Sequence, residues 1–231
     1  MRARSSFDEG HMIQAVESLN AYVQAHPGSN RLDEALLLLG LARQRTDENQ
    51  VAVEDFNRLI RDFPQSPYRE QAEFERARCS LNEALSPPRD AEATETALAL
   101  LRAYVLRYPE GEYAEAASKG IEDCLERLAV KAFLNAETYL RLKRDRAAMI
   151  YLEKALGIKK EFSRAGAALM ELARVRERLG EVAEAREAWE DLLEYATPER
   201  IERDRRLGQW RREAESALGR LSSTGEQGQD P

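Results

Sequence analysis

Residue types that carry catalytic chemistry are scarce in this chain. Its 231 residues include only two histidines and two cysteines. Neither His11 nor His26 has a Cys, His or carboxylate at the spacing of a metal site. The sequence also has no Gly-x-Ser-x-Gly, Gly-x-Gly-x-x-Gly, P-loop or His-Glu-x-x-His motif. We therefore expect no catalytic residues, no metal site, no cofactor and no enzymatic activity.

Long apolar runs and basic stripes are absent as well. The longest apolar stretch, residues 35–41, is broken by Gly40 and is far shorter than the roughly 20 residues of a membrane-spanning helix. The net charge is −7, and arginine and glutamate are interleaved along the chain. No basic segment with interleaved aromatic residues is present. The sequence therefore predicts neither a transmembrane helix nor a nucleic-acid partner.

The first six residues, Met-Arg-Ala-Arg-Ser-Ser, lack the apolar core of a signal peptide. Two interpretations stay open. Either the protein is cytoplasmic, or the sequence begins after a targeting segment that has been removed.

Cys79 and Cys124 each follow a tyrosine by eleven residues, so they occupy equivalent places in successive helices. Equivalent positions in stacked helices are roughly 10 Å apart. A disulfide needs Cα atoms within about 7 Å of each other. We expect two small packing residues, with a disulfide as the alternative.

An alanine inside a helical stretch is repeatedly followed, twelve residues later, by a proline. The pairs are Ala15 and Pro27, Ala52 and Pro64, and Ala97 and Pro109. A small residue that allows close helix approach, followed by a proline that ends the helix, is typical of the second helix of a tetratricopeptide (TPR) unit. Ala148 and Ala185 begin two further copies, in which Lys160 or Thr197-Pro198 stands near the proline position.

Apolar residues spaced by three and four residues extend this pattern along the chain. Second helices are predicted at 12–25, 50–63, 91–108, 146–159 and 182–196, and first helices at 32–46, 69–85, 113–142 and 163–179. A last helix, 198–221, begins with Thr197 as its cap and covers the final repeat. The predicted fold is all-α: a superhelical solenoid of about five TPR helix pairs with a C-terminal capping helix.

We expect one solenoid domain over residues 7–221. Its N-terminal half covers about 7–110 and its C-terminal half about 111–221. Residues 1–6 and 222–231 are small or polar and are expected to be disordered tails. A Pro/Asp insertion at 86–90 separates two helices near the centre.

Two turns share a more specific pattern, Phe/Tyr-Pro-x-Ser/Gly-x-Tyr-x3-Ala. They are Phe63-Pro-Gln-Ser-Pro-Tyr68 with Ala72 and Tyr108-Pro-Glu-Gly-Glu-Tyr113 with Ala117. This pattern resembles the periplasmic TPR proteins of Gram-negative bacteria, and within them the BamD family of outer-membrane lipoproteins. The resemblance covers roughly residues 7–196. The chain departs from the family at residues 158–161, where the usual aromatic-proline pair is missing.

The resemblance implies a non-enzymatic scaffold of the outer-membrane β-barrel assembly machinery. Its N-terminal repeats would receive segments of unfolded β-barrel precursors. Its C-terminal repeats would dock onto the POTRA domains of BamA, next to other assembly lipoproteins. A lipid anchor on an N-terminal cysteine, absent from this sequence, would be the only membrane contact. The protein would then lie at the periplasmic face of the outer membrane if a lipidated signal sequence precedes Met1, and in the cytoplasm otherwise.

TPR geometry places certain side chains of the first helices on the concave groove. The predicted groove residues are Leu37, Leu41, Gln44, Arg45, Phe74, Arg78 and Asn82. The leucines also fit a core stripe, whereas Phe74 lies off the apolar stripe of its helix.

Arg174 and Arg178 lie four residues apart in a predicted first helix. We predict that they pair with carboxylates of the docking partner. A solvated helix face is the alternative interpretation.

Two other functions stay open. One is a cytosolic TPR adaptor that binds a short peptide, although the groove residues do not form a carboxylate clamp of Lys, Arg and Asn. The other is a periplasmic adaptor similar to the CpoB family, which shares the aromatic-proline turns but has a coiled-coil segment that this chain lacks.

Overall fold

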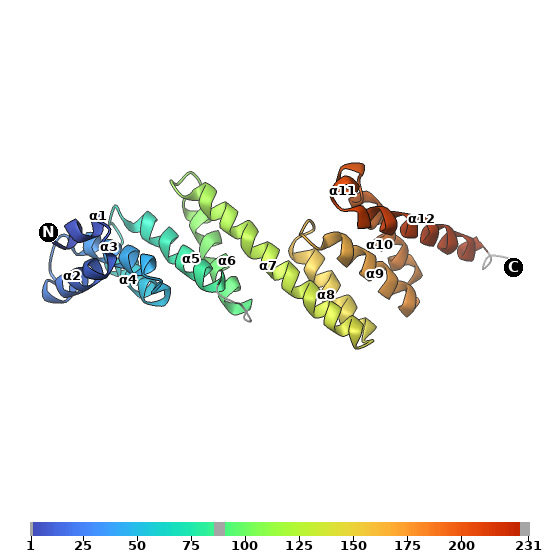
Figure 1. Cartoon of the computed structure of the whole chain (residues 1–231), viewed down its shortest axis with the longest axis horizontal. Helices are drawn as coiled ribbons and strands as arrows, with labels where there is room; N and C mark the ends of the chain where they lie inside the picture. Colours follow the sequence, from blue (N-terminus) through green and yellow to red (C-terminus); the bar gives the residue numbers. More distant parts are fainter. Residues whose placement is uncertain (1, 86–90, 227–231) are drawn as a thin grey trace. The chain divides into compact units, whose positions relative to one another are not determined.

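The computed structural model describes residues 2–85 and 91–226. In this part of the chain the secondary structure is helical, in the order drawn in Figure 1. The helices are α1 (Arg2–Asp8), α2 (Met12–Ala25), α3 (Leu32–Arg45), α4 (Asn49–Asp62), α5 (Arg69–Leu85), α6 (Ala91–Arg107), α7 (Ala114–Arg141), α8 (Asp145–Ile158), α9 (Ala165–Leu179), α10 (Val182–Tyr195), α11 (Pro198–Arg203) and α12 (Arg205–Glu226). The predicted insertion at 86–90 lies outside the described residues.

The five alanines that start the repeat pattern are all completely buried. They are Ala15, Ala52, Ala97, Ala148 and Ala185. Each belongs to the second helix of a pair, and consecutive helices pack on one another from α1 to α6 and from α8 to α10. A small side chain at these points lets the helix backbones approach closely. The prediction of an all-α fold built from TPR helix pairs is confirmed.

Side-chain contacts repeat at the length of one TPR unit. The hydroxyl of Ser66 donates to Asp33, 33 residues earlier, and the hydroxyl of Tyr104 donates to Glu70, 34 residues earlier. In α9, Arg178 bonds a residue 33 positions earlier. The first bond joins the turn before α5 to α3, the second joins α6 to α5 of the same pair, and the third joins α9 to α8.

The chain forms two compact units, residues 1–124 (unit 1) and 125–231 (unit 2). The division falls inside α7, whereas the sequence predicted it near residue 110. The helix predicted at 113–142 corresponds to α7, a single helix of 28 residues. The prediction that both halves form one solenoid stays a prediction.

The core of unit 1 lies between α2, α3, α4 and α5, around Leu19, Leu36 and Phe56. The core of unit 2 lies between the second part of α7, α8, α9 and α10, around Phe133, Leu172 and Trp189. Helix α12 packs on α10 and buries Ala214 and Ala217 against this second core. The predicted capping role of the last helix is therefore confirmed.

The prediction of two disordered tails is wrong in part, because helices extend into both of them. Residues 2–8 form α1, in which Arg4 Nη1 donates to Glu34 Oε1 at 2.7 Å and Phe7 packs against the unit 1 core. At the other end, α12 continues to Glu226. The hydroxyl of Ser222 donates to the carbonyl of Leu218 at 2.8 Å inside this helix.

The predicted final helix begins as expected and then breaks. The Thr197 hydroxyl accepts the amide of Arg200 at 3.4 Å, and Pro198 occupies the first turn. Asp204 is extended (φ −132°, ψ 98°) and separates α11 from α12. Its carboxylate accepts the amide of Arg206 at 3.0 Å, so it starts a new helix instead of continuing the first one.

The two cysteines are buried, as expected for packing residues, and the alternative disulfide is not formed. In the described residues, no helix combines the length and apolar character that crossing a membrane requires.

Candidate functional site

The predicted groove residues lie on α3 and α5, the first helices of two successive pairs in unit 1. These two helices contact each other directly. The guanidinium of Arg78 on α5 donates to the side-chain carbonyl of Gln44 on α3, a bond that again spans 34 residues. The structure therefore places the two predicted sets of residues on neighbouring helices.

Two predicted groove residues are buried and do not line an open surface. Leu37 is only 4% exposed and belongs to the unit 1 core. Phe74 is 6% exposed because its ring stacks on Tyr113 at 4.7 Å and lies against Tyr104 at 5.7 Å. The sequence placed Phe74 off its own helix stripe but did not reveal that the turn before α7 supplies the ring that covers it.

The other five predicted groove residues keep some exposure: Leu41, Gln44, Arg45, Arg78 and Asn82. The guanidinium of Arg45 lies 4.6 Å from the centre of the Phe7 ring on α1. Asn82 donates to the side-chain carbonyl of Asn49 at 3.4 Å. The accessible face thus offers two guanidinium groups and two amides next to a half-buried leucine.

A buried carboxylate fixes the position of Arg78. Glu75 is 4% exposed, and its Oε2 lies 2.7 Å from Nη2 of Arg78. Burial raises the pKa of Glu75, and the nearby charge of Arg78 opposes this shift. The amide of Gln44 also reaches Cys79, whose Sγ accepts it at 3.2 Å. Glu75 was not among the residues predicted from the sequence, because the burial of its neighbour Phe74 is known only from the structure.

The thiol of Cys79 is held in its neutral form. Burial raises its pKa to about 11. This cysteine therefore packs as a small apolar residue beneath the polar face and is not a reactive thiolate.

The first aromatic-proline turn is fixed by Ser66. Its amide donates to the carbonyl of Phe63 at 3.0 Å, and its hydroxyl donates to Asp33 at 2.7 Å. The amide of Tyr68 in turn donates to the Ser66 hydroxyl at 3.1 Å. The serine of the turn pattern therefore ties α4 and α5 back to α3.

The predicted docking arginines are engaged within unit 2. Arg174 makes two bonds of 2.7 Å to the carboxylate of Glu213 on α12 and one of 3.2 Å to Glu171. Arg178 makes bonds of 2.9 and 2.7 Å to Asp145 at the start of α8. Such bidentate pairs tie α9 to its neighbours. Neither arginine is the unpaired surface cation that the sequence suggested, and docking through them stays a prediction.

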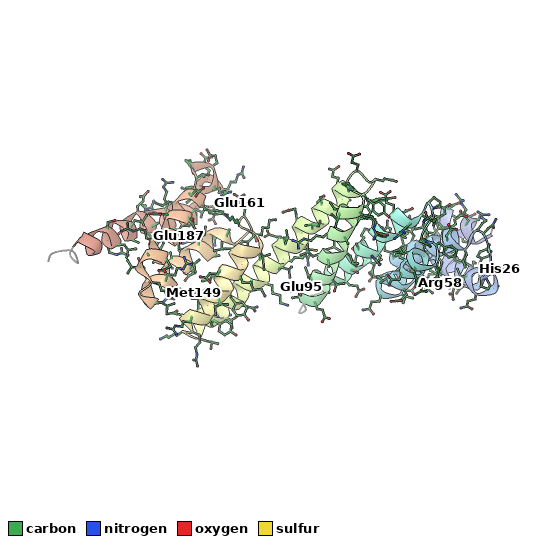
Figure 2. All side chains as sticks on the ribbon, turned by 180° about the vertical axis from the view of Figure 1, so that it is seen from behind. His26, Arg58, Glu95, Met149, Glu161 and Glu187 are labelled. Atoms are coloured by element: carbon green, nitrogen blue, oxygen red, sulfur yellow. The ribbon has the colours of Figure 1, made fainter. Side chains whose placement is uncertain are left out.

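Unit 2 contains a cleft of about 660 Å³ between α8, α9 and α10. Apolar side chains of Leu156, Leu169 and Leu172 contribute to its lining. Carboxylates from α10 line it as well, including Glu187, which Figure 2 labels together with Glu161 of the loop between α8 and α9. Five carboxylates and three cations line this cleft together with the leucines, so its net charge is negative.

Asp191 lies close to other carboxylates of this cleft. Burial raises its pKa, and the neighbouring carboxylates of Glu187 and Glu194 raise it further. Lys160 acts in the opposite direction. In the described part of the chain, no group of three or more His, Cys, Asp or Glu residues is arranged to hold a metal ion.

Comparison with protein families gives one match over most of the chain. A family model named YfiO, described as an outer membrane lipoprotein, matches residues 1–192. The match covers all of unit 1 and continues into α10 of unit 2.

A curated relative is the outer membrane protein assembly factor BamD of Caulobacter vibrioides. The two sequences are 32% identical over 134 residues, which is 58% of this chain and 44% of the relative. The match thus spans less than half the length of that relative.

Solved structures of TPR proteins are more distant. A tetratricopeptide repeat protein from Parabacteroides merdae is 18% identical with a TM-score of 0.39, covering 98% of this chain and 75% of the other. A thermophilic TPR protein from Thermus thermophilus is 17% identical with a TM-score of 0.37, covering 94% and 95%.

Proposed function

The chain belongs to the YfiO family of outer membrane lipoproteins, and from this membership we propose that it is a non-enzymatic scaffold subunit of outer-membrane β-barrel assembly, working at the periplasmic face of that membrane. The family match over residues 1–192 is the observation that carries the proposal. The name of the Caulobacter relative, an assembly factor, supports the same role. Helix pairs that expose polar side chains on one face suit a protein that holds other polypeptides.

Unit 1 receives extended segments of unfolded β-barrel precursors in this proposal. The accessible residues of α3 and α5 suit such a ligand, because guanidinium groups donate to backbone carbonyls and carboxylates while Leu41 offers an apolar contact. The pairing of Arg78 with Glu75 holds one of these guanidinium groups in place before binding.

The double variant Arg45→Gln/Arg78→Gln is expected to bind a labelled, urea-unfolded precursor about tenfold more weakly than the parent chain. A tenfold loss of affinity corresponds to losing about one hydrogen bond to a charged group. Fluorescence anisotropy of the labelled precursor against the full chain measures it.

The matched control removes the same charge from α4, with Arg58→Gln/Arg61→Gln (Arg58 is labelled in Figure 2). These arginines lie on the second helix of their pair, and both form an ion pair with Asp62. The control is expected to change affinity less than about twofold. Equal weakening by both double variants would reject the groove in favour of unspecific charge attraction.

Unit 2 docks onto the POTRA domains of BamA in this proposal, with Arg174 and Arg178 as contact residues. Since Arg178 already holds Asp145, a substitution of Arg178 alone would disturb both the fold and the docking. The exchange Asp145→Arg/Arg178→Asp keeps an ion pair between α8 and α9 and reverses its direction.

We expect this exchanged variant to stay folded and to bind purified POTRA domains at least about tenfold more weakly. A pull-down with salt titration, together with circular dichroism of the same sample, gives both readings. Unchanged docking by the exchanged variant would remove Arg178 from the interface.

A further inference from the structure

A second cavity in unit 2 is lined by arginines and aromatic rings. It encloses about 330 Å³ between the loop before α9, the first turn of α9, α11 and the start of α12. Its cationic and aromatic lining comes from Arg164, Arg200, Arg203, Arg206, Tyr195 and Trp210. It shares Glu161, Tyr195 and Arg200 with the neighbouring acidic cleft, but its lining has the opposite net charge.

The charge of this cavity differs from that of the whole chain. Four guanidinium groups face two carboxylates, those of Glu161 and Asp204, so the lining carries a net charge of +2 (four minus two). The complete chain carries −7. An excess of positive charge around a partly enclosed space favours an anionic ligand, because the low-dielectric walls strengthen the attraction.

Two of the four arginines already hold carboxylates. Arg200 Nη2 lies 2.6 Å from Oε1 of Glu161. Arg206 contacts both carboxylate oxygens of Asp204, at 3.0 and 2.8 Å. The arginines of this cavity therefore already bind carboxylate groups, those of Glu161 and Asp204.

Aromatic rings keep these two guanidinium groups in place. The Arg200 guanidinium lies 4.2 Å from the centre of the Tyr195 ring, and that of Arg206 lies 5.6 Å from the centre of the Trp210 ring. A stacked guanidinium loses little further freedom when it binds a second acceptor.

The other two arginines have unused donors. Arg164 and Arg203 are exposed, and within the described residues neither side chain makes a hydrogen bond or a salt bridge; the pKa of Glu199 is lowered by a backbone hydrogen bond and also by the charge of Arg203. Glu161 is 71% exposed, so an incoming carboxylate is able to displace it from Arg200 at little cost. The cavity thus has both free donors and one exchangeable internal anion.

We propose that this cavity binds a glutamate or aspartate side chain from an acidic peptide segment of a partner protein. Arg164 and Arg203 hold the carboxylate, and Trp210 contacts the apolar part of the segment. This proposal is independent of the proposed groove and of docking through Arg174 and Arg178. It holds whether or not the partner is part of an assembly machinery.

The fluorescence of Trp210 can report binding at this site. The chain has two tryptophans, of which Trp210 lines the cavity while Trp189 is 1% exposed in the unit 2 core. Titrating the full chain with the blocked peptide Glu-Glu-Leu-Glu-Glu is expected to change tryptophan emission with saturation. The same peptide with glutamine at every glutamate gives no saturable change, and Trp210→Phe abolishes the change.

The double variant Arg164→Gln/Arg203→Gln is expected to bind the peptide at least about tenfold more weakly, since each lost bond to a charged group is worth about one decade. Arg146→Gln/Arg212→Gln is the matched control. It removes the same charge from exposed positions of unit 2 that do not line the cavity. This control is expected to change affinity less than about twofold.

Three results would overturn the proposal. Equal weakening by the two double variants would mean unspecific charge attraction. A full emission change in Trp210→Phe would place the peptide elsewhere. Tighter binding of inorganic phosphate or of phosphatidylglycerol vesicles than of the peptide would make the cavity a phosphate site, either for the free ion or for a lipid headgroup.

Discussion

Replacing Arg43 by methionine is expected to lower the free energy of unfolding by about 3 kcal/mol at pH 8. Arg43 Nη1 on α3 lies 2.7 Å from Oδ2 of Asp55 on α4, and the two side chains are only 14% and 11% exposed. Removing the guanidinium leaves a carboxylate without its cation inside unit 1. Urea denaturation of the full chain, followed by circular dichroism, measures the loss.

The size of this effect depends on pH. Burial raises the pKa of Asp55 from 3.8 to about 6, although Arg43 opposes the shift. A carboxyl whose folded pKa is raised costs stability above that pKa, and this cost disappears as the pH falls through the folded pKa toward 3.8. Arg43→Met raises the folded pKa of Asp55 further. The difference between variant and parent should therefore be largest at pH 8 and much smaller at pH 5.

Two further variants separate the buried charge from other causes. Arg43→Met/Asp55→Leu removes both charges and is expected to return to within about 1 kcal/mol of the parent. Arg61→Met deletes an arginine that is 72% exposed and should leave the midpoint nearly unchanged at both pH values. A loss in Arg43→Met that is the same at pH 5 and pH 8 would show that lost packing, and not the carboxylate, causes it.

Gly40→Ala is expected to destabilise unit 1 by about 1–3 kcal/mol. A Cβ at residue 40 would lie 2.6 Å from Cε1 and 2.7 Å from Cζ of Phe56. Phe56 is completely buried, so its ring has no free space into which it could move. The gain of about 1 kcal/mol from alanine in a helix is smaller than this clash. Thermal unfolding followed by circular dichroism gives the shift.

The chain offers a matched glycine. Gly219 lies inside α12, where an added Cβ would meet no atom within 4 Å. Gly219→Ala should therefore stabilise unit 2 slightly, by about 0.5–1 kcal/mol. Adding Phe56→Leu to Gly40→Ala should recover part of the loss, because the shorter side chain vacates the position of the ring tip. If Gly40→Ala were as stable as the parent, the close approach of α3 to α4 would be disproved.

The helix pairs were predictable because local chemistry determines them. A buried alanine such as Ala52 and a terminating proline such as Pro64 mark the same points of each unit, and burial of the alanines agrees with the pattern. The glycine of α3 was predictable for the same reason, since a missing side chain in a helix indicates a close neighbour. The identity of that neighbour, Phe56, came only from the structure.

Helix α1 was not predictable from its own residues. Arg4 and Phe7 gain their partners, Glu34 and Arg45, from α3, which lies about 30 residues further along the chain. The break at Asp204 was not predictable either. The Asp204 side chain accepts the amide of Arg206, and apolar periodicity does not show whether this bond forms or the helix continues.

The helices that carry the site residues could be predicted from the sequence, but the surroundings of each side chain could not. TPR geometry identified α3 and α5 as the helices of one face, yet it could not foresee that Tyr113 covers Phe74. Similarly, Arg178 was a candidate for pairing with a carboxylate, and its acceptor proved to be Asp145 of the same chain. The arginines of α11 and α12 were visible in the sequence, but only the fold places them around one cavity with Arg164.

We propose that cells need this chain to assemble β-barrel proteins into the outer membrane. The most direct test depletes the chain from its own cells and quantifies outer-membrane β-barrel proteins by mass spectrometry. We expect the whole class to fall while other envelope proteins stay constant, with rescue by the parent chain and only weak rescue by Arg45→Gln/Arg78→Gln. Unchanged levels of the β-barrel proteins after full depletion would contradict the account.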